Sequence, residues 1–203
     1  MAINGKDRII FFGDSLTEQG EKPKGYVALL RDTLVKRFPG IAIIGAGVSG
    51  NKVPQLLDRV DHDVIALRPT IVVIYIGIND LWHFEKHGTG TPKDKYESGI
   101  RDLITRIRTA GAQVVLCTPS VIGEQHHGEN KFDTMLDEYS AISRRVAHES
   151  GAKICDLRKS FTSYLDTHNP ENNVEGILTL DSVHLNDAGN RLVADTILKT
   201  LTE

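Results

Sequence analysis

The chain has 203 residues, with 24 Lys and Arg against 27 Asp and Glu, and a formal net charge of −3. This balance lacks the basic surface on which nucleic-acid-binding proteins depend, so nucleic acid is excluded as a partner. No apolar run is long enough to insert into a membrane, and the length fits a single domain over residues 1–203.

Short apolar runs of β-type residues alternate with helical segments. The first run reaches Asp14 after only a few apolar residues, which is typical of a strand and not of a signal peptide, so a cytoplasmic location is expected. The predicted strands are Arg8–Phe12, Ile41–Ile44, Thr70–Ile76, Gln113–Thr118 and Lys153–Asp156. Because these runs are apolar on both faces, they indicate a parallel sheet covered by helices.

Four helices are predicted between and after these strands. They are Gly25–Phe38, a helix from Pro92 to near Gly111 capped by Thr91, Phe132–Ser150 and Leu185–Leu201. The alternation predicts a three-layer, doubly wound α/β fold whose five-stranded parallel sheet has the flavodoxin-like order 2-1-3-4-5. In that order the loops after strands 1, 2 and 3 meet at one edge, and they carry Ser15, Gly50 and Asn79.

Two groups of residues are candidate metal ligands. Cys117 and Cys155 fall in predicted strands without a C-x-x-C motif, so two buried thiols are expected and no disulfide or metal site. The segment GEQHHGEN (residues 123–130) has two histidines and two glutamates. Adjacent histidines rarely point to one centre, so a solvated loop is expected there and no metal.

The segment FFGDSLTEQG places Ser15 directly after a predicted buried strand. A serine at this position is a candidate nucleophile if a base lies nearby, although a helix cap is the simpler interpretation of an isolated Ser-Asp pair. The G-x-S-x-G elbow of α/β-hydrolases is absent, since Thr17 occupies its second glycine position.

Asp181 precedes His184 by three residues in TLDSVHLND. On a helix-like turn this spacing brings both side chains to one face, where the carboxylate could orient the imidazole as in a Ser-His-Asp triad. The alternative is a loop aspartate and a partly exposed histidine before a helix capped by Asn186.

In IYIGIND, Gly77 permits a tight turn after an apolar strand, and Asn79 follows at the sheet edge. An amide N–H at this position could stabilise an oxyanion, although Gly, Asn and Asp are also the ordinary residues of turns.

The segment GAGVSGN fits the G-x-G-x-x-G fingerprint of dinucleotide-binding turns. That interpretation needs an acidic residue at the end of the next strand, but none occurs before Asp80. Pro54 also lies early in the helix that would cradle the pyrophosphate. A turn that offers the bare N–H of Gly50 fits better, and a nucleotide-binding α/β protein stays the less favoured alternative.

Together and in this order, the four motifs resemble the GDSL-type, or SGNH, family of serine hydrolases, from Gly13 to His184. The resemblance implies a flavodoxin-like fold and an esterase, lipase, thioesterase or carbohydrate-deacetylase activity. Two positions depart from the family pattern: Gly45, where Asn is frequent, and Lys52, where Thr is frequent.

The expected mechanism uses Ser15 as nucleophile, His184 as base and Asp181 to orient the imidazole. The Ser15 and Gly50 N–H groups and the Asn79 amide form the oxyanion hole, and no cofactor is expected.

The expected substrate is a small water-soluble ester with an acetyl to butyryl group. Trp82, His83 and Phe84 are predicted to line its pocket, and Asp14 and Asp80 to brace the site's loops. A lysophospholipase or thioesterase activity is the alternative within the same family.

Overall fold

The computed structural model describes residues 3–203, apart from the side chains of residues 85 and 86. Its sheet has five strands: β1 (Arg8–Gly13), β2 (Ala42–Gly47), β3 (Ile71–Tyr75), β4 (Gln113–Cys117) and β5 (Lys153–Cys155). All pair in parallel in the order β2-β1-β3-β4-β5. The predicted fold class and strand order are confirmed.

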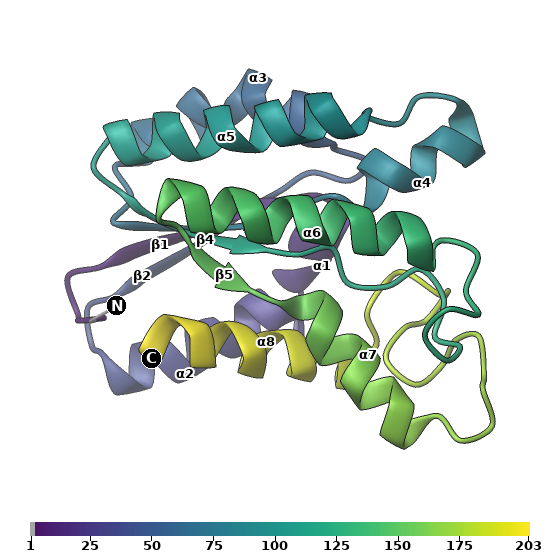
Figure 1. Cartoon of the computed structure of the whole chain (residues 1–203). Helices are drawn as coiled ribbons and strands as arrows, with labels where there is room; N and C mark the ends of the chain where they lie inside the picture. The colour runs from purple at the N-terminus through teal and green to yellow at the C-terminus, as the bar shows by residue number, and fades with distance from the viewer. Residues whose placement is uncertain (1–2) are drawn as a thin grey trace.

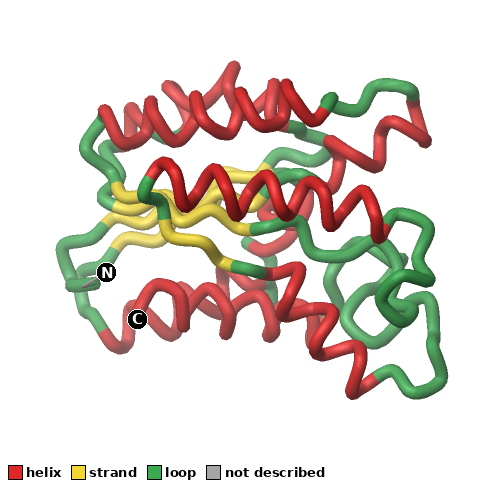
Figure 2. The backbone as a smooth tube through the Cα atoms, in the orientation of Figure 1, coloured by secondary structure: helices red, strands yellow, loops and turns green. Residues whose placement is uncertain are grey.

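Eight α-helices occur in the described residues: α1 (Ser15–Gly20), α2 (Tyr26–Arg37), α3 (Val53–Asp63), α4 (Ile78–His87), α5 (Lys93–Thr109), α6 (Asp133–Ser150), α7 (Leu157–His168) and α8 (Asp187–Thr202). Helices α3, α5 and α6 cover one face of the sheet, and α2 and α8 cover the other (Figure 1). The strands thus form the middle of three layers (Figure 2).

The sheet is apolar on both faces because helices cover both. Every residue of β3 is buried, as are the residues of β1 after Arg8. Cys117 and Cys155 lie opposite one another on β4 and β5, and both are buried free thiols, as predicted. Because β1 pairs in parallel with both β2 and β3, the carboxyl ends of these three strands lie side by side.

The predicted cap of α5 is wrong. Pro92 has an extended ψ of 148°, so the helix begins at Lys93, and Thr91 lies one residue too early to cap it. The Thr91 N–H instead donates to the Asp80 carbonyl at 2.8 Å. The predicted cap of the last helix is confirmed, because the Asn186 side chain accepts the Gly189 N–H at 3.0 Å.

Candidate active site

Ser15 is the first residue of α1 and follows β1 after a single intervening residue, Asp14. The Asp14 carboxylate caps the helix by accepting the Leu16 N–H at 3.0 Å, which turns the chain sharply out of the strand. Burial raises the pKa of Asp14 to about 7, and the nearby Asp80 adds to this effect. Ser15 is only 9% exposed, and its N–H lies at the helix start, where no intrahelical acceptor exists.

The structure brings Ser15 together with the distant Asp181 and His184. Ser15 Oγ lies 3.1 Å from His184 Nε2, and His184 Nδ1 lies 2.8 Å from Asp181 Oδ2. Asp181 Oδ1 accepts the backbone N–H groups of His184 at 2.7 Å and of Val183 at 3.2 Å. Partial burial opposes the charge of Asp181, but the hydrogen bonds from His184 outweigh it and lower the pKa of this carboxyl.

Asn79 is the second residue of α4, so IYIGIND is a strand followed by a helix and not an isolated turn. Gly77 precedes this helix with φ 128°, and a Cβ there would lie 2.6 Å from Pro119 Cγ. Asn79 Nδ2 donates to the Asn51 carbonyl at 3.0 Å, and it lies 3.5 Å from Asp14 Oδ2. Its side chain is therefore held between the ends of β1, β2 and β3.

The three glycines of the dinucleotide-like motif have separate structural roles. A Cβ at Gly47 would lie 2.1 Å from the Glu18 N, so α1 packs on β2 only because this residue is glycine. Gly45 leaves space for Glu21, so an Asn here would have to displace that carboxylate. Gly50 has φ 77°, and within residues 3–203 its N–H has no hydrogen-bond acceptor.

Asp80 supports the loops at the carboxyl ends of these strands through a backbone hydrogen bond, as predicted. It is fully buried, and its Oδ1 accepts the Val53 N–H at 3.0 Å at the start of α3. Burial raises the pKa of Asp80 to about 6.

Arg59 on α3 is a residue of this site that the sequence interpretation missed. Its guanidinium donates to the carbonyls of Gly13 at 2.7 Å and Ala46 at 3.0 Å, and to Asn51 Oδ1 at 2.8 Å. It thereby joins the ends of β1 and β2 to the residue whose carbonyl holds Asn79. The buried positions Val53, Leu56 and Val60 carry a helical signal that could have located α3.

The three predicted substrate-binding residues lie on α4, with Trp82 partly buried against the core. The rings of Trp82 and His83 are 6.5 Å apart. Phe84 is 37% exposed and packs against Gly90, where a Cβ would lie 2.2 Å from the ring. Their role in binding substrate stays a prediction.

The segment 123–130 is only partly the solvated loop that was predicted, because His127, Gly128 and Glu129 are exposed whereas Gly123 and Glu124 are buried. His126 Nε2 lies 3.0 Å from the Asn169 carbonyl, and His127 Nε2 lies 2.8 Å from Asp137, so the two rings have separate partners. Glu124 is fully buried, and its carboxylate accepts backbone N–H groups of the loop that carries Asp181, which offsets the cost of burying it. In the part of the chain that the structure describes, no group of His, Cys, Asp and Glu has metal-site geometry.

The sequence profile of the GDSL-like lipase/acylhydrolase family matches residues 11–192, and the chain belongs to this family. It is a carboxylic ester hydrolase of the serine esterase type. Family membership favours the hydrolase interpretation of the glycine-rich turn over the dinucleotide interpretation.

Several relatives are named for acetate esters. An acetylxylan esterase from Geobacillus stearothermophilus is 30% identical, covering 99% of this chain and 96% of the relative. The crystal structure of the acetyl xylan esterase AlAXEase superposes with a TM-score of 0.93 at 41% identity, covering 96% and 99% of the two chains. An isoamyl acetate-hydrolyzing esterase 1 homolog from Rattus norvegicus is 25% identical, covering 92% and 78%.

None of the helices in residues 3–203 combines the length and apolar character needed to cross a membrane.

Proposed function

We propose that this esterase hydrolyses short-chain acyl esters, acetyl to butyryl, on a small water-soluble alcohol through an acyl-Ser15 intermediate. The observation that carries the proposal is the continuous hydrogen-bonded series from Ser15 Oγ through His184 to Asp181. It stands at the sheet edge where Gly50 and Asn79 also lie.

Acylation begins when Ser15 Oγ attacks the ester carbonyl carbon and gives its proton to His184 Nε2. Asp181 accepts the hydrogen bond from Nδ1–H, which leaves Nε2 as the proton acceptor and stabilises the imidazolium that forms. When the tetrahedral intermediate collapses, the C–O bond of the ester breaks, and the departing alcohol takes the proton from Nε2.

The negative charge that develops on the carbonyl oxygen needs preorganised donors. Two are backbone N–H groups, at Ser15 and Gly50, neither of which is used in a helix or turn hydrogen bond. The third is the Asn79 amide. Its Nδ2 donates to the Asn51 carbonyl at 3.0 Å and makes only a long contact of 3.5 Å with Asp14 Oδ2, which the oxyanion would replace as acceptor of the second proton.

Deacylation repeats these steps with water as the nucleophile. His184 removes a proton from water as its oxygen attacks the acyl carbon, and then returns that proton to Ser15 Oγ as the acyl–enzyme bond breaks. Free acid and the starting enzyme result, so the cycle balances without a cofactor.

The short-acyl preference is supported by the names of the relatives, which refer to acetylxylan and isoamyl acetate. A long acyl chain gains about 0.8 kcal/mol per buried CH₂ only where a continuous apolar groove can bury it. We place Trp82, His83 and Phe84 along the acyl or alcohol side of the pocket as its proposed walls.

The test is kcat/KM across p-nitrophenyl esters from C2 to C12, together with acetylated xylose and a lysophospholipid. We expect a maximum at C2 to C4 and release of acetate from the sugar. A maximum at C8 or longer, or faster turnover of the lysophospholipid, would instead assign the alternative lipase or thioesterase activity. Ser15→Ala measured in parallel gives the rate of background hydrolysis, which is subtracted from each measurement.

A further inference from the structure

The Asp181–His184 pair stands on a loop and not on a strand or helix. The loop is closed by an isolated antiparallel bridge between Thr179 and Leu185, with the Leu180 N–H donating to the His184 carbonyl at 2.7 Å. These local bonds shape the loop but do not fix its distance from Ser15. Something outside the loop must therefore hold it against the sheet edge.

Glu124 makes that external contact. Its Oε1 accepts the N–H groups of Leu178 at 2.7 Å and Thr179 at 2.5 Å, and its Oε2 accepts the Ile177 N–H at 2.7 Å. Hydrogen bonds to an ionised acceptor are about twice as strong as neutral ones. Three consecutive backbone amides, ending two residues before Asp181, are thus gathered on one buried carboxylate.

The backbone around Glu124 is tied to the same loop. The Gly123 N–H donates to the Ser182 carbonyl at 2.8 Å, and the Glu124 N–H donates to the Val174 carbonyl at 2.9 Å. The Glu124 carbonyl in turn accepts from Asn169 Nδ2 at 2.7 Å. Two points of the segment between α7 and α8, Val174 and Ser182, are therefore connected to one short stretch after β4.

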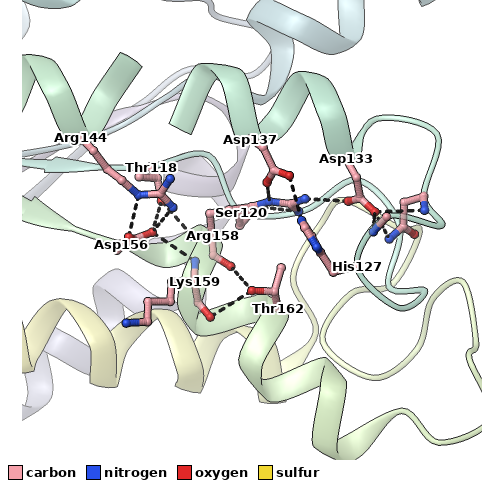
Figure 3. A network of polar contacts seen from close by, with 12 residues as sticks. Thr118, Ser120, His127, Asp133, Asp137, Arg144, Asp156, Arg158, Lys159 and Thr162 are labelled. Atoms are coloured by element: carbon pink, nitrogen blue, oxygen red, sulfur yellow. Dashed lines mark hydrogen bonds and ion pairs between the residues drawn. The ribbon is translucent and has the colours of Figure 1, made fainter. Parts of the chain in front are cut away.

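That stretch is itself anchored to two helices through the polar network in Figure 3. Asp133 on α6 accepts the backbone N–H groups of Gly128 at 2.8 Å and Asn130 at 3.1 Å. Arg158 on α7, whose side chain is 3% exposed, binds Asp133 at 2.7 Å and Asp137 at 2.8 Å. A path of hydrogen bonds thus leads from the packed helices through the 123–130 segment to the catalytic loop.

We propose that Glu124 is a positioning residue for ester hydrolysis, which holds residues 177–179 so that the Asp181–His184 pair faces Ser15. The inference rests on the proposed catalytic roles of Ser15, Asp181 and His184. A displacement of about 1 Å in a catalytic group can lower the rate about 10²-fold, and removing the acceptor of two buried N–H groups and one part-buried N–H group would allow such a displacement.

The test compares three variants with the wild type. Glu124→Gln keeps the shape but turns an NH₂ group toward the backbone amides. Glu124→Asp keeps the charge and both acceptors on a shorter side chain. Glu129→Gln is the matched control, because it makes the same change on an exposed residue of the same segment, and its amide oxygen can still accept the one hydrogen bond that Asn172 Nδ2 donates to this side chain.

We expect Glu124→Gln to lower kcat about 10- to 100-fold with KM changed less than about threefold, and to slow labelling of Ser15 by a fluorophosphonate in parallel. Rates are expressed per active site titrated, so a loss of folded enzyme alone would not change them. The amides of residues 177–179 should exchange faster with solvent, while those of β1 and β3 keep their protection. Glu124→Asp should recover part of kcat, and Glu129→Gln should stay within about twofold of wild type.

A wild-type protein that neither hydrolyses esters nor labels at Ser15 would overturn the proposed function itself. With an active wild type, a folded Glu124→Gln enzyme whose kcat stays within about threefold would overturn the inference alone. If Glu124→Gln does not fold by circular dichroism, Glu124→Asp carries the test. Failure of both to fold would also overturn it, because Glu124 would then serve the stability of the fold.

Discussion

The two halves of the candidate active site are built in different ways. Ser15 and Asn79 follow buried strands of the central sheet within two to four residues, and they are 9% and 5% exposed. Asp181 and His184 stand on a loop before α8, and the Asp181 side chain is 55% exposed. The sheet thus positions Ser15 and Asn79, which we call the serine side. The position of Asp181 and His184, the acid–base side, depends in part on polar side chains such as Glu124.

This difference predicts two kinds of response to substitution. On the serine side, a change in a chemical group should remove a catalytic step without moving its neighbours, because strands fix the backbone. On the acid–base side, residues remote from the reaction should also alter kcat, because Glu124 helps to hold the loop together with its buried residues Leu178, Val183 and Leu185. Variants on the serine side, compared with the Glu124 variants, test this difference.

Ser15→Ala should have the largest effect, reducing ester hydrolysis by more than about 10³-fold while the thermal unfolding midpoint stays near that of wild type. Removal of the nucleophile ends acyl-enzyme formation, whereas the β1–α1 turn is held by Asp14 and not by the serine hydroxyl. Ser163→Ala, on an exposed position of α7, is the control. Residual activity above roughly a hundredth of wild type would contradict the assignment of Ser15 as nucleophile.

Asn79→Ala should lower kcat about 10²- to 10³-fold with little change in KM, because an oxyanion donor acts on the transition state and not on bound substrate. Steady-state kinetics with a short-chain ester separate the two constants. If only KM rises, Asn79 binds substrate in the ground state and the oxyanion hole needs a different third donor.

Arg59→Lys should have an intermediate effect, because an ammonium group cannot reach the Gly13, Ala46 and Asn51 acceptors together. We expect kcat to fall about tenfold and the free energy of unfolding to fall by about 1–3 kcal/mol, because part-buried acceptors are left unpaired. Kinetics and urea denaturation measure the two effects. Arg37→Lys, on an exposed residue of α2, should change neither, and equal losses in both variants would remove the special role of Arg59.

Asp80→Asn should act on stability and its pH dependence. Burial raises the pKa of Asp80 from 3.8 to about 6, so the folded state holds a proton that the unfolded chain releases at lower pH. The stability that this gives is full below about pH 4 and is lost as pH rises through 6. Wild type should therefore lose on the order of 3 kcal/mol relative to Asp80→Asn between pH 4 and 7.

Urea denaturation of both proteins at four pH values measures this difference. Parallel stability curves would show that Asp80 ionises in the folded protein as readily as in the unfolded chain.

Strands were predicted to within three residues at each end because both of their faces are apolar, a signal that needs no tertiary information. Four helices were missed for two reasons. In α7 the buried residues Leu157, Phe161 and Leu165 recur at helical spacing, and α3 carries a similar pattern, so both could have been found. By contrast, α1 has six residues and α4 begins in a turn-like GIND sequence, so neither has a clear periodic signal.

Within the site, the residues predicted from motifs do meet, and their catalytic roles stay predictions until the variants are measured. The single domain over residues 1–203, the cytoplasmic location and the substrate contacts of Trp82, His83 and Phe84 also stay predictions. The sequence indicates Glu124 only as a possible metal ligand in a solvated loop, although it is fully buried in the structure. No local pattern distinguishes a glutamate that binds distant amides from one that faces water.

The sequence by itself determined the fold class, the strand order and the family, because alternating apolar segments and ordered motifs are local properties of the chain. Only the tertiary structure decided that Arg59 and Glu124 support the site, whereas Asp14 and Asp80 could be named from the motifs. The partners of Arg59 lie up to 46 positions away, and those of Glu124 lie 53 to 55 positions away. A charged side chain becomes part of a site only when folding excludes water and presents acceptors or donors of matching geometry, and that depends on how the elements pack.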